Sequence, residues 1–306
     1  MPLAKLENLS LPALFEELIS PAHLATLLRL AFDEDLGDMG DITTQFAVDD
    51  GASGSARIVA REAGILAGVP VLDAALRQLA PQISWWWCAD DGEAVAPGTV
   101  VCDLSGELAT ILQVERLLLN MLSRLSGVAT TTARFVEAVA GSRAVICDTR
   151  KTTPGFRAIE KYAVRCGGGT LHRIGLHDAV LIKDNHLGDR SAAECAQHIR
   201  AAAVRARESV PLRFVEAEVD SLCQFNALLE LEKGVLDIVL LDNMNIEQLC
   251  EAVARRNATA PWLLLEASGG VTLATVRDIA VTGVDRIAVG ALTHSAMQLD
   301  FGLDLR

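Results

Sequence analysis

Six short apolar runs recur after residue 140, and they constrain the fold of this chain more than any other feature. Each run is rich in Val, Ile and Leu, and helical stretches such as 191–207 and 273–283 lie between them. This alternation is typical of a parallel sheet covered by helices. Six runs favour a closed or nearly closed α/β barrel over an open doubly wound sheet, and no G-x-G-x-x-G follows a run. The runs are AVICD (144–148), AVLIKD (179–184), LRFVEAEV (212–219), DIVLLDN (237–243), WLLLEAS (262–268) and RIAVGA (286–291).

The first third of the chain has a different pattern. Apolar spacing predicts two helices within residues 1–35, which Pro21 separates. Residues 53–113 hold β-like runs, the last of them LATILQ at 108–113, around one predicted helix at 71–80. We expect these elements to form a small α+β sandwich.

Two local features of this part allow specific predictions. Trp85, Trp86 and Trp87 are interpreted as a strand packed on both faces, with a ligand-stacking platform as the alternative. From Glu115 the pattern becomes that of a long amphipathic helical region, which we expect to be interrupted near Gly127.

Polar residues and glycines follow the predicted strands of the second part. Barrel enzymes build their sites at the carboxyl ends of strands, although each such residue could also simply cap its strand. On one strand, Phe214, Glu216 and Glu218 share a face, so both glutamates should point into the barrel, with Glu218 nearer the mouth. The strand-end residues are Arg150, Lys151, Lys183, Asp184, Asn185, Glu218, Asp242, Asn243, Ser268, Gly269, Gly270 and Gly290.

The sequence Ser268-Gly269-Gly270 also predicts a phosphate site. A helix expected to begin near Thr272 would direct backbone N–H groups towards one point, where an anion can bind. Gly290-Ala291 ends the last strand, and barrels frequently build phosphate sites from these last two loops.

Charge is distributed unevenly along the chain. Residues 148–186 hold seven cations and four anions, whereas the whole chain has a net charge of −13. An anionic ligand explains such a basic stretch, while the acidic total argues against nucleic acid or an anionic membrane as a partner. Arg157, Lys161 and Arg165 are set apart, because their helical spacing favours a solvated helix face.

Seven cysteines without a C-x-x-C pair predict reduced thiols and a cytoplasmic location. From the residues alone, two other functions stay open. Lys183 could form a Schiff base in an aldolase-like barrel, or the chain could bind a phosphorylated metabolite without catalysis.

Many motifs, in order along nearly the whole chain, resemble those of the quinolinate phosphoribosyltransferase family. A related branch of similar fold has an unsettled activity, and the KYAVRCGGG and IKDNH segments resemble the quinolinate branch instead. The motifs are EDLGDMGDITT, GILAGVPV, VERLLLNMLSRLSGVAT, DTRKTTPGFRAIEKYAVRCGGG, HRIGLHDAVLIKDNH, EAEVDS, VLLDNM, EASGGVT and VGALTHSA.

The resemblance implies an α/β fold, with an N-terminal α+β sandwich followed by an incomplete, open α/β barrel. On this basis we expect the sandwich at 1–114, the barrel at 115–293, and a C-terminal tail at 294–306 that returns to the first domain. The implied enzyme is a pentosyltransferase of NAD biosynthesis that needs Mg²⁺. It would join quinolinate to phosphoribosyl pyrophosphate (PRPP) and give nicotinate mononucleotide, pyrophosphate and CO₂.

The resemblance also implies roles for individual residues. The quinolinate site would comprise Arg150, His172, Arg173 and Lys183, with Arg116 reaching in from the partner of a homodimer, or of a larger assembly of dimers. From the residues alone, Arg116 could instead pair with Glu115. Leu171 stands where the family usually has Asn, so the fine geometry beside His172 is a point to check. The catalytic residues would be Lys151, Lys183, Glu218 and Asp242, and two of them, Glu218 and Asp242, would also be the metal ligands. The PRPP and Mg²⁺ side would comprise Lys151, Glu218, Asp242, Ser268, Gly269, Gly270, Gly290 and Ala291.

Overall fold

The structure is a computed structural model, and it describes residues 6–306. The chain forms two compact units, and each unit is built from several separate stretches of the sequence. Residues 6–9, 134–152 and 169–295 form the parallel-sheet unit, and residues 10–133, 153–168 and 296–306 form the antiparallel-sheet unit. The first five residues of the predicted N-terminal domain lie outside the described residues.

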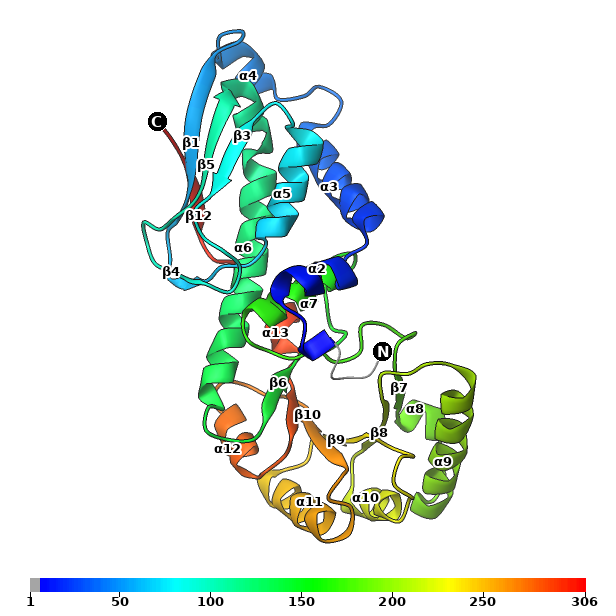
Figure 1. Cartoon of the computed structure of the whole chain (residues 1–306). Helices are drawn as coiled ribbons and strands as arrows, with labels where there is room; N and C mark the ends of the chain where they lie inside the picture. Colours follow the sequence, from blue (N-terminus) through cyan, green and yellow to red (C-terminus); the bar gives the residue numbers. More distant parts are fainter. Residues whose placement is uncertain (1–5) are drawn as a thin grey trace. The chain divides into compact units, whose positions relative to one another are not determined.

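The parallel-sheet unit contains one six-stranded sheet, ordered β6-β11-β10-β9-β8-β7. Every neighbouring pair in it is parallel. The sheet curves, and α9, α10, α11 and α12 lie along its outer side (Figure 1). Its strands are β6 (Val145–Cys147), β7 (Val180–Ile182), β8 (Val215–Val219), β9 (Ile238–Asp242), β10 (Leu264–Ser268) and β11 (Arg286–Ala288). Its helices are α8 (Asp184–Leu187), α9 (Ala192–Ser209), α10 (Leu222–Leu229), α11 (Ile246–Thr259), α12 (Val276–Val281) and α13 (Ala291–His294).

Each of the six predicted strands is present, and the predicted open α/β barrel is confirmed. The edge strands β6 and β7 are not neighbours in the sheet, although Thr170 adds one parallel bridge beside Cys147 of β6. Short connections fix the strand ends: Ser221 caps α10 just after β8, and Asn245 caps α11 just after β9.

The antiparallel-sheet unit contains a four-stranded sheet, ordered β12-β1-β5-β3, and a small two-stranded sheet of β2 and β4. The C-terminal strand β12 pairs with β1 from Ala56–Leu305 to Ala60–Phe301. Its strands are β1 (Ser53–Ala60), β2 (Gly64–Ile65), β3 (Ser84–Trp87), β4 (Ala94–Val95), β5 (Val100–Glu107) and β12 (Phe301–Leu305). Its helices are α2 (Leu11–Leu18), α3 (Pro21–Leu36), α4 (Ile42–Ala47), α5 (Val69–Leu79), α7 (Arg157–Cys166) and most of α6 (Leu108–Ala138).

Two predictions about α6 are wrong. Residues 108–113 were expected to be a strand, but they begin this helix, because a short apolar run does not by itself distinguish a strand from a buried helix. The helix also continues through Gly127 without interruption. A Cβ at Gly127 would lie 1.8 Å from the carbonyl oxygen of Met297, so this glycine permits a close backbone approach.

The contact-based units also differ from the expected consecutive domains. Residues 108–133 of α6 belong to the antiparallel-sheet unit, and side chains of this part of the helix bond that unit's backbone. The N–H of Ile65 donates to Thr130 Oγ1 at 2.8 Å, and the N–H of Ala67 donates to Ser126 Oγ at 3.1 Å.

Two further predictions fail on burial. The three tryptophans lie on strand β3 as expected, but Trp86 is 74% exposed, so the strand is packed on one face only. Trp85 and Trp87 face the other way, and both indole N–H groups donate to Asp73 Oδ1.

Lys161 lies on α7 but is fully buried, so the solvated-face prediction is wrong for it. Helix α7 is buried on most sides, which its charged residues do not reveal.

Candidate active site

A cavity of about 520 Å³ lies at the carboxyl ends of the parallel strands. It brings together residues from the ends of all six parallel strands and from the irregular segment after Thr170, as the strand-end pattern predicted. The predicted site residues that line it are Arg150, Lys151, His172, Arg173, Lys183, Glu218, Asp242, Ser268, Gly269 and Gly270.

Three predicted site residues do not line this cavity. Gly290 borders it, because a Cβ there would lie 3.1 Å from Cδ of Lys151, and Ala291 follows as the first residue of α13. Arg116 lies on α6 in the antiparallel-sheet unit. Its side chain is 60% exposed, with Nη2 3.7 Å from Oε1 of Glu115, which is the ion pair considered as its alternative role.

Residues with charges of both signs lie at the rim of the cavity. We call these five residues the mouth set: Arg150, Arg173, Lys183, Glu218 and Asp242. Lys183 Nζ donates to Glu218 Oε2. Asp242 Oδ2 accepts a bond from Asn243 Nδ2 at 2.6 Å, and Asn243 has a left-handed backbone with φ 53°. Asn243 is therefore held in an uncommon conformation beside the carboxylate that it supports.

The two arginines of the mouth set form no direct ion pair with the rest of the described chain, although the charges of Glu216, Asp178 and Glu218 act on Arg173 from further away. Among residues 6–306, neither guanidinium forms an ion pair, and the buried Nε of Arg150 has no hydrogen-bond partner. Burial lowers the pKa of Arg173, and the positive charge of Arg150 lowers it further. Two neighbouring cations without a carboxylate partner form a natural binding site for an anion.

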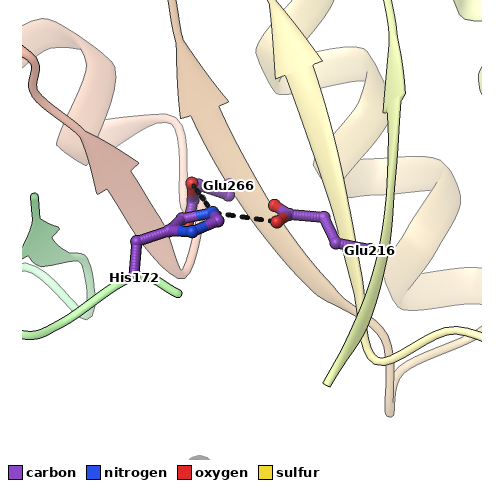
Figure 2. Close-up of side chains that lie close together, drawn as sticks. All are labelled: His172, Glu216 and Glu266. Carbon is purple, nitrogen blue, oxygen red and sulfur yellow. Dashed lines mark ion pairs between the residues drawn. The ribbon is translucent and has the colours of Figure 1, made fainter. Parts of the chain in front are cut away.

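Beneath the mouth set lies a buried cluster that we call the inner layer: His172, Glu216, Glu266 and Arg286. Figure 2 shows the ring of His172 between the two carboxylates. His172 Nε2 lies 2.9 Å from Glu216 Oε2 and 3.3 Å from Glu266 Oε1, and both glutamates are fully buried. Arg286 Nε donates to Glu266 Oε2 at 2.8 Å. The expectation that Glu216 and Glu218 share the inner face, with Glu218 nearer the mouth, agrees with this burial.

The inner layer shifts the pKa values of its members in opposite directions. Burial lowers the pKa of His172, but the charges of Glu266 and Glu216 outweigh burial and raise it to about 10. Burial raises the pKa of Glu266, but His172 and Arg286 bring it down to about 2. Burial and the charge of Glu266 raise the pKa of Glu216.

The proton on His172 Nε2 decides whether this cluster suits a metal ion. His172, Glu216 and Glu266 have the side-chain types of a metal site and lie close enough together for one. The backbone N–H of Arg173 points at Nδ1 from 2.8 Å, which opposes protonation there, whereas the two carboxylates favour the doubly protonated ring. Nε2 carries a proton in either form, so it has no lone pair for a metal, and we interpret the cluster as an ion-pair network.

The Ser268–Gly270 loop follows β10 as expected, but the next helix begins later than predicted. Helix α12 starts at Val276 and not near Thr272, because Thr272 and Thr275 form a separate turn first. Gly269 and Gly270 both have positive φ, 104° and 57°. A Cβ on Gly269 would lie 2.1 Å from Asn243 Oδ1, so the glycine permits the close approach of the β9 and β10 ends.

Several cavity residues had no predicted role. Glu266 could have been found, because it lies two residues before Ser268 and so shares its face of β10. Asn243 is one of the predicted polar strand-end residues, but its support of Asp242 depends on a backbone conformation that the sequence does not show. The lining residues without a predicted role are Thr149, Leu181, Leu240, Asn243, Glu266 and Ala288.

The fold and the cavity define a class of protein: an α/β barrel with a cavity at its strand ends that is lined by arginines, carboxylates and a glycine loop. Two family models match the chain, the quinolinate phosphoribosyl transferase N-terminal domain at residues 41–126 and the C-terminal domain at residues 128–304. The chain therefore belongs to the quinolinate phosphoribosyltransferase family, as its motifs predicted.

Named relatives agree with this family. A nicotinate-nucleotide pyrophosphorylase [carboxylating] of Mycobacterium leprae is 43% identical over 281 residues, which cover 91% of this chain and 95% of the relative. A probable enzyme of the same name from Synechocystis is 38% identical and covers 89% of both chains. The structure of the nicotinate-nucleotide pyrophosphorylase from Francisella tularensis has a TM-score of 0.83 and 35% identity, and covers 94% of this chain and 98% of that one. The predicted reaction is the one that these names describe.

No helix among the described residues combines the length and the apolar character needed to cross a membrane.

Proposed function

We propose that the cavity binds quinolinate and PRPP side by side and transfers the phosphoribosyl group to the quinolinate nitrogen, with loss of CO₂. Arg150 and Arg173 carry this proposal, because two cations without ion pairs stand at the same rim as the carboxylates Glu218 and Asp242. A dianionic ring and an activated sugar need these opposite surroundings within one cavity.

On the quinolinate side, we assign Arg150, His172, Arg173 and Lys183 to the two adjacent carboxylates. Arginine suits this task because its planar guanidinium can form two parallel bonds to one carboxylate. His172 and Lys183 line the same cavity, with His172 Nε2 facing Glu216 and Lys183 Nζ donating to Glu218.

On the PRPP side, we assign Lys151 to the phosphates and Glu218 and Asp242 to the ribose hydroxyls. Ser268, Gly269 and Gly270 form the adjacent loop and would hold the 5′-phosphate with Gly290 and Ala291. The glycines let the backbone N–H groups approach the phosphate closely.

The chemistry follows from these placements without a protein nucleophile. The quinolinate nitrogen attacks C1 of the ribose while the C1–O bond breaks and pyrophosphate leaves with the electron pair. Glu218 and Asp242 offset the positive charge that develops on the sugar. The carboxylate next to the new pyridinium then leaves as CO₂, the ring keeps the electron pair of the broken C–C bond, and a proton replaces CO₂ at that carbon. Fixed positions and charges therefore provide most of the catalysis.

We assign Mg²⁺ to Glu218 and Asp242. The donor set suits this ion, because Mg²⁺ usually takes one or two carboxylates and completes its shell with water and substrate phosphates. Both carboxylates face the cavity from neighbouring strands, β8 and β9. Bound there, Mg²⁺ would supply charge neutralisation for the pyrophosphate oxygens.

We assign Arg116 to the quinolinate site of a partner subunit in a homodimer. Its exposed side chain and weak pairing with Glu115 leave the guanidinium available for such a contact. Mixing an inactive Arg116→Ala variant with an inactive Lys183→Ala variant should restore part of the activity. No recovery after proven subunit exchange would exclude the shared site.

Lys183 as a Schiff-base nucleophile is disfavoured because its Nζ is engaged by Glu218 in an ion pair. We also assign the protein to the cytoplasm, because all seven cysteines are unpaired, as expected in a reducing compartment.

The test of the whole proposal is a direct assay of CO₂, pyrophosphate and nicotinate mononucleotide from quinolinate, PRPP and Mg²⁺. If none of the three forms, the proposal is wrong.

A further inference from the structure

The segment from Leu171 to Asp178 carries His172 and Arg173 to the cavity without a helix or strand of its own. Buried backbone N–H and C=O groups outside regular structure need partners from elsewhere. Much of that need is met here by one buried ion pair. Arg213 Nη1 lies 3.0 Å from Asp178 Oδ2, and the two side chains are 2% and 12% exposed.

The two members of the pair bind opposite kinds of backbone group. Arg213 donates from Nη1 to the carbonyl of His172 at 3.3 Å and from Nη2 to the carbonyl of Leu171 at 3.5 Å. Asp178 accepts the N–H groups of Ile174 and Gly175 at 2.8 and 2.9 Å. One ion pair thus fixes the backbone on both sides of Arg173.

The same segment is held at two more points. The N–H of His172 donates to Asp148 Oδ1 at 2.8 Å. The ring of Phe214, the residue after Arg213, meets the ring of His172 edge to face, with centroids 5.3 Å apart. The backbone and the ring of His172 are therefore both fixed, and Arg213–Asp178 is the link that reaches furthest along the segment.

We propose that Arg213 and Asp178 are positioning residues for quinolinate recognition, because their ion pair holds residues 171–175 so that His172 and Arg173 face the cavity in one geometry. This inference rests on the proposed function, which assigns both of those residues to quinolinate. Neither Arg213 nor Asp178 lines the cavity, so they act through the segment and not on the substrate. Small displacements of binding groups weaken recognition strongly.

A second buried pair, Arg256–Asp285, provides a matched control. Arg256 Nη1 lies 2.6 Å from Asp285 Oδ2 and donates to the carbonyl of Leu263 at 2.6 Å. Asp285 in turn accepts the N–H of Leu265 at 2.8 Å. Both pairs are arginine–aspartate pairs of low exposure that bind backbone groups, although Asp285 also pairs with Arg143. Neither Arg256 nor Asp285 lines the cavity.

The experiment compares Arg213→Met and Arg256→Met with the unmodified enzyme. We expect both variants to melt at a lower temperature, because each loses a buried ion pair. Only Arg213→Met should raise the KM for quinolinate, by about tenfold, with the KM for PRPP within about twofold. Arg213→Lys keeps the charge but not the planar fork, so its KM for quinolinate should be intermediate.

If Arg213→Met does not fold, Arg213→Lys still tests the inference, because its KM for quinolinate should rise, by less than about tenfold, while its KM for PRPP stays unchanged. An unchanged KM for quinolinate would overturn the inference, and so would equal rises in both KM values. If Arg256→Met raises the KM for quinolinate as much as Arg213→Met does, the rise comes from general destabilisation and the inference is wrong. An unmodified enzyme that releases no CO₂ would overturn the proposed function, and this inference with it.

Discussion

The mouth set and the inner layer lie on the same face of the same sheet, yet their charges are arranged differently. Glu216 and Glu218 are two residues apart on β8, a rise of about 7 Å along the strand. In the inner layer, His172 lies within 3.3 Å of both glutamates, and Arg286 within 2.8 Å of Glu266. In the mouth set, Arg150 and Arg173 form no ion pair among residues 6–306.

The difference shows how depth decides what a charge can do. A fully buried charge without a partner costs several kcal/mol, so the inner layer must balance itself. Arg150 is only half-buried, so water lowers that cost for it, whereas Arg173 beside it is buried and is left for a substrate to neutralise. Stability should therefore depend mainly on the inner layer, and substrate binding and turnover on the mouth set.

The largest effect on stability is expected from Glu266→Gln. The substitution keeps the shape of the side chain but removes the charge that faces both His172 and Arg286. Arg286 then keeps one carboxylate partner, Glu7, whose Oε1 lies 3.5 Å from Arg286 Nη1. We expect a loss of about 3–5 kcal/mol in the free energy of unfolding, measured by urea denaturation.

Glu251→Gln is the control for this variant, because Glu251 pairs with Arg255 at the surface and should contribute less than about 1 kcal/mol. If Glu266→Gln is no less stable than Glu251→Gln, charge balance does not hold the inner layer together.

The next effect in size concerns turnover. Glu218→Gln should lower kcat about 100-fold, because it removes the charge that offsets the developing positive charge on the sugar. The unfolding free energy should change by less than about 1 kcal/mol, since Glu218 borders the cavity. Steady-state kinetics with both substrates saturating and urea denaturation test the two halves separately. A large loss of stability with normal kcat would reverse the distinction between the two layers.

Much of this site could be predicted from the sequence because its signals are local. Strand ends such as Lys183 and Asp242 can be located from apolar runs, and alternation along β8 places Glu216 beneath Glu218. The same rule finds Glu266 when it is applied to β10.

Other features depend on contacts between residues far apart in the chain. The burial of Lys161 and the close approach of Gly127 to Met297 have no local signal. Arg213 and Asp178 are likewise 35 residues apart, and nothing near either residue indicates the pair.

Recognition of quinolinate gives the third prediction. Arg173→Ala should raise the KM for quinolinate about tenfold and change the KM for PRPP little, because a charged hydrogen bond contributes about 1.5–3 kcal/mol. Arg200→Ala is the control, since Arg200 pairs with Glu232 at the surface. Initial rates at varied concentrations of each substrate separate the two KM values. A KM for quinolinate equal to that of the Arg200 variant would remove Arg173 from the binding site.

The smallest effect is expected from Asn243→Gly, which tests whether the mouth set gives up stability for geometry. Asn243 has φ 53°, a conformation that costs glycine less than asparagine, so the variant should be as stable as the unmodified protein or more stable by up to about 1 kcal/mol. The same change removes the bond from Asn243 Nδ2 to Asp242 Oδ2, and kcat should fall by about threefold.

The free energy of unfolding and kcat of Asn243→Gly should change in opposite directions. Gly269 leaves room for Asn243 Oδ1, so the β9 and β10 ends are shaped around this side chain. Urea denaturation and kcat, measured on the same preparation, should therefore move apart. A variant that loses both stability and turnover would show that Asn243 supports the fold of the rim and not the position of Asp242.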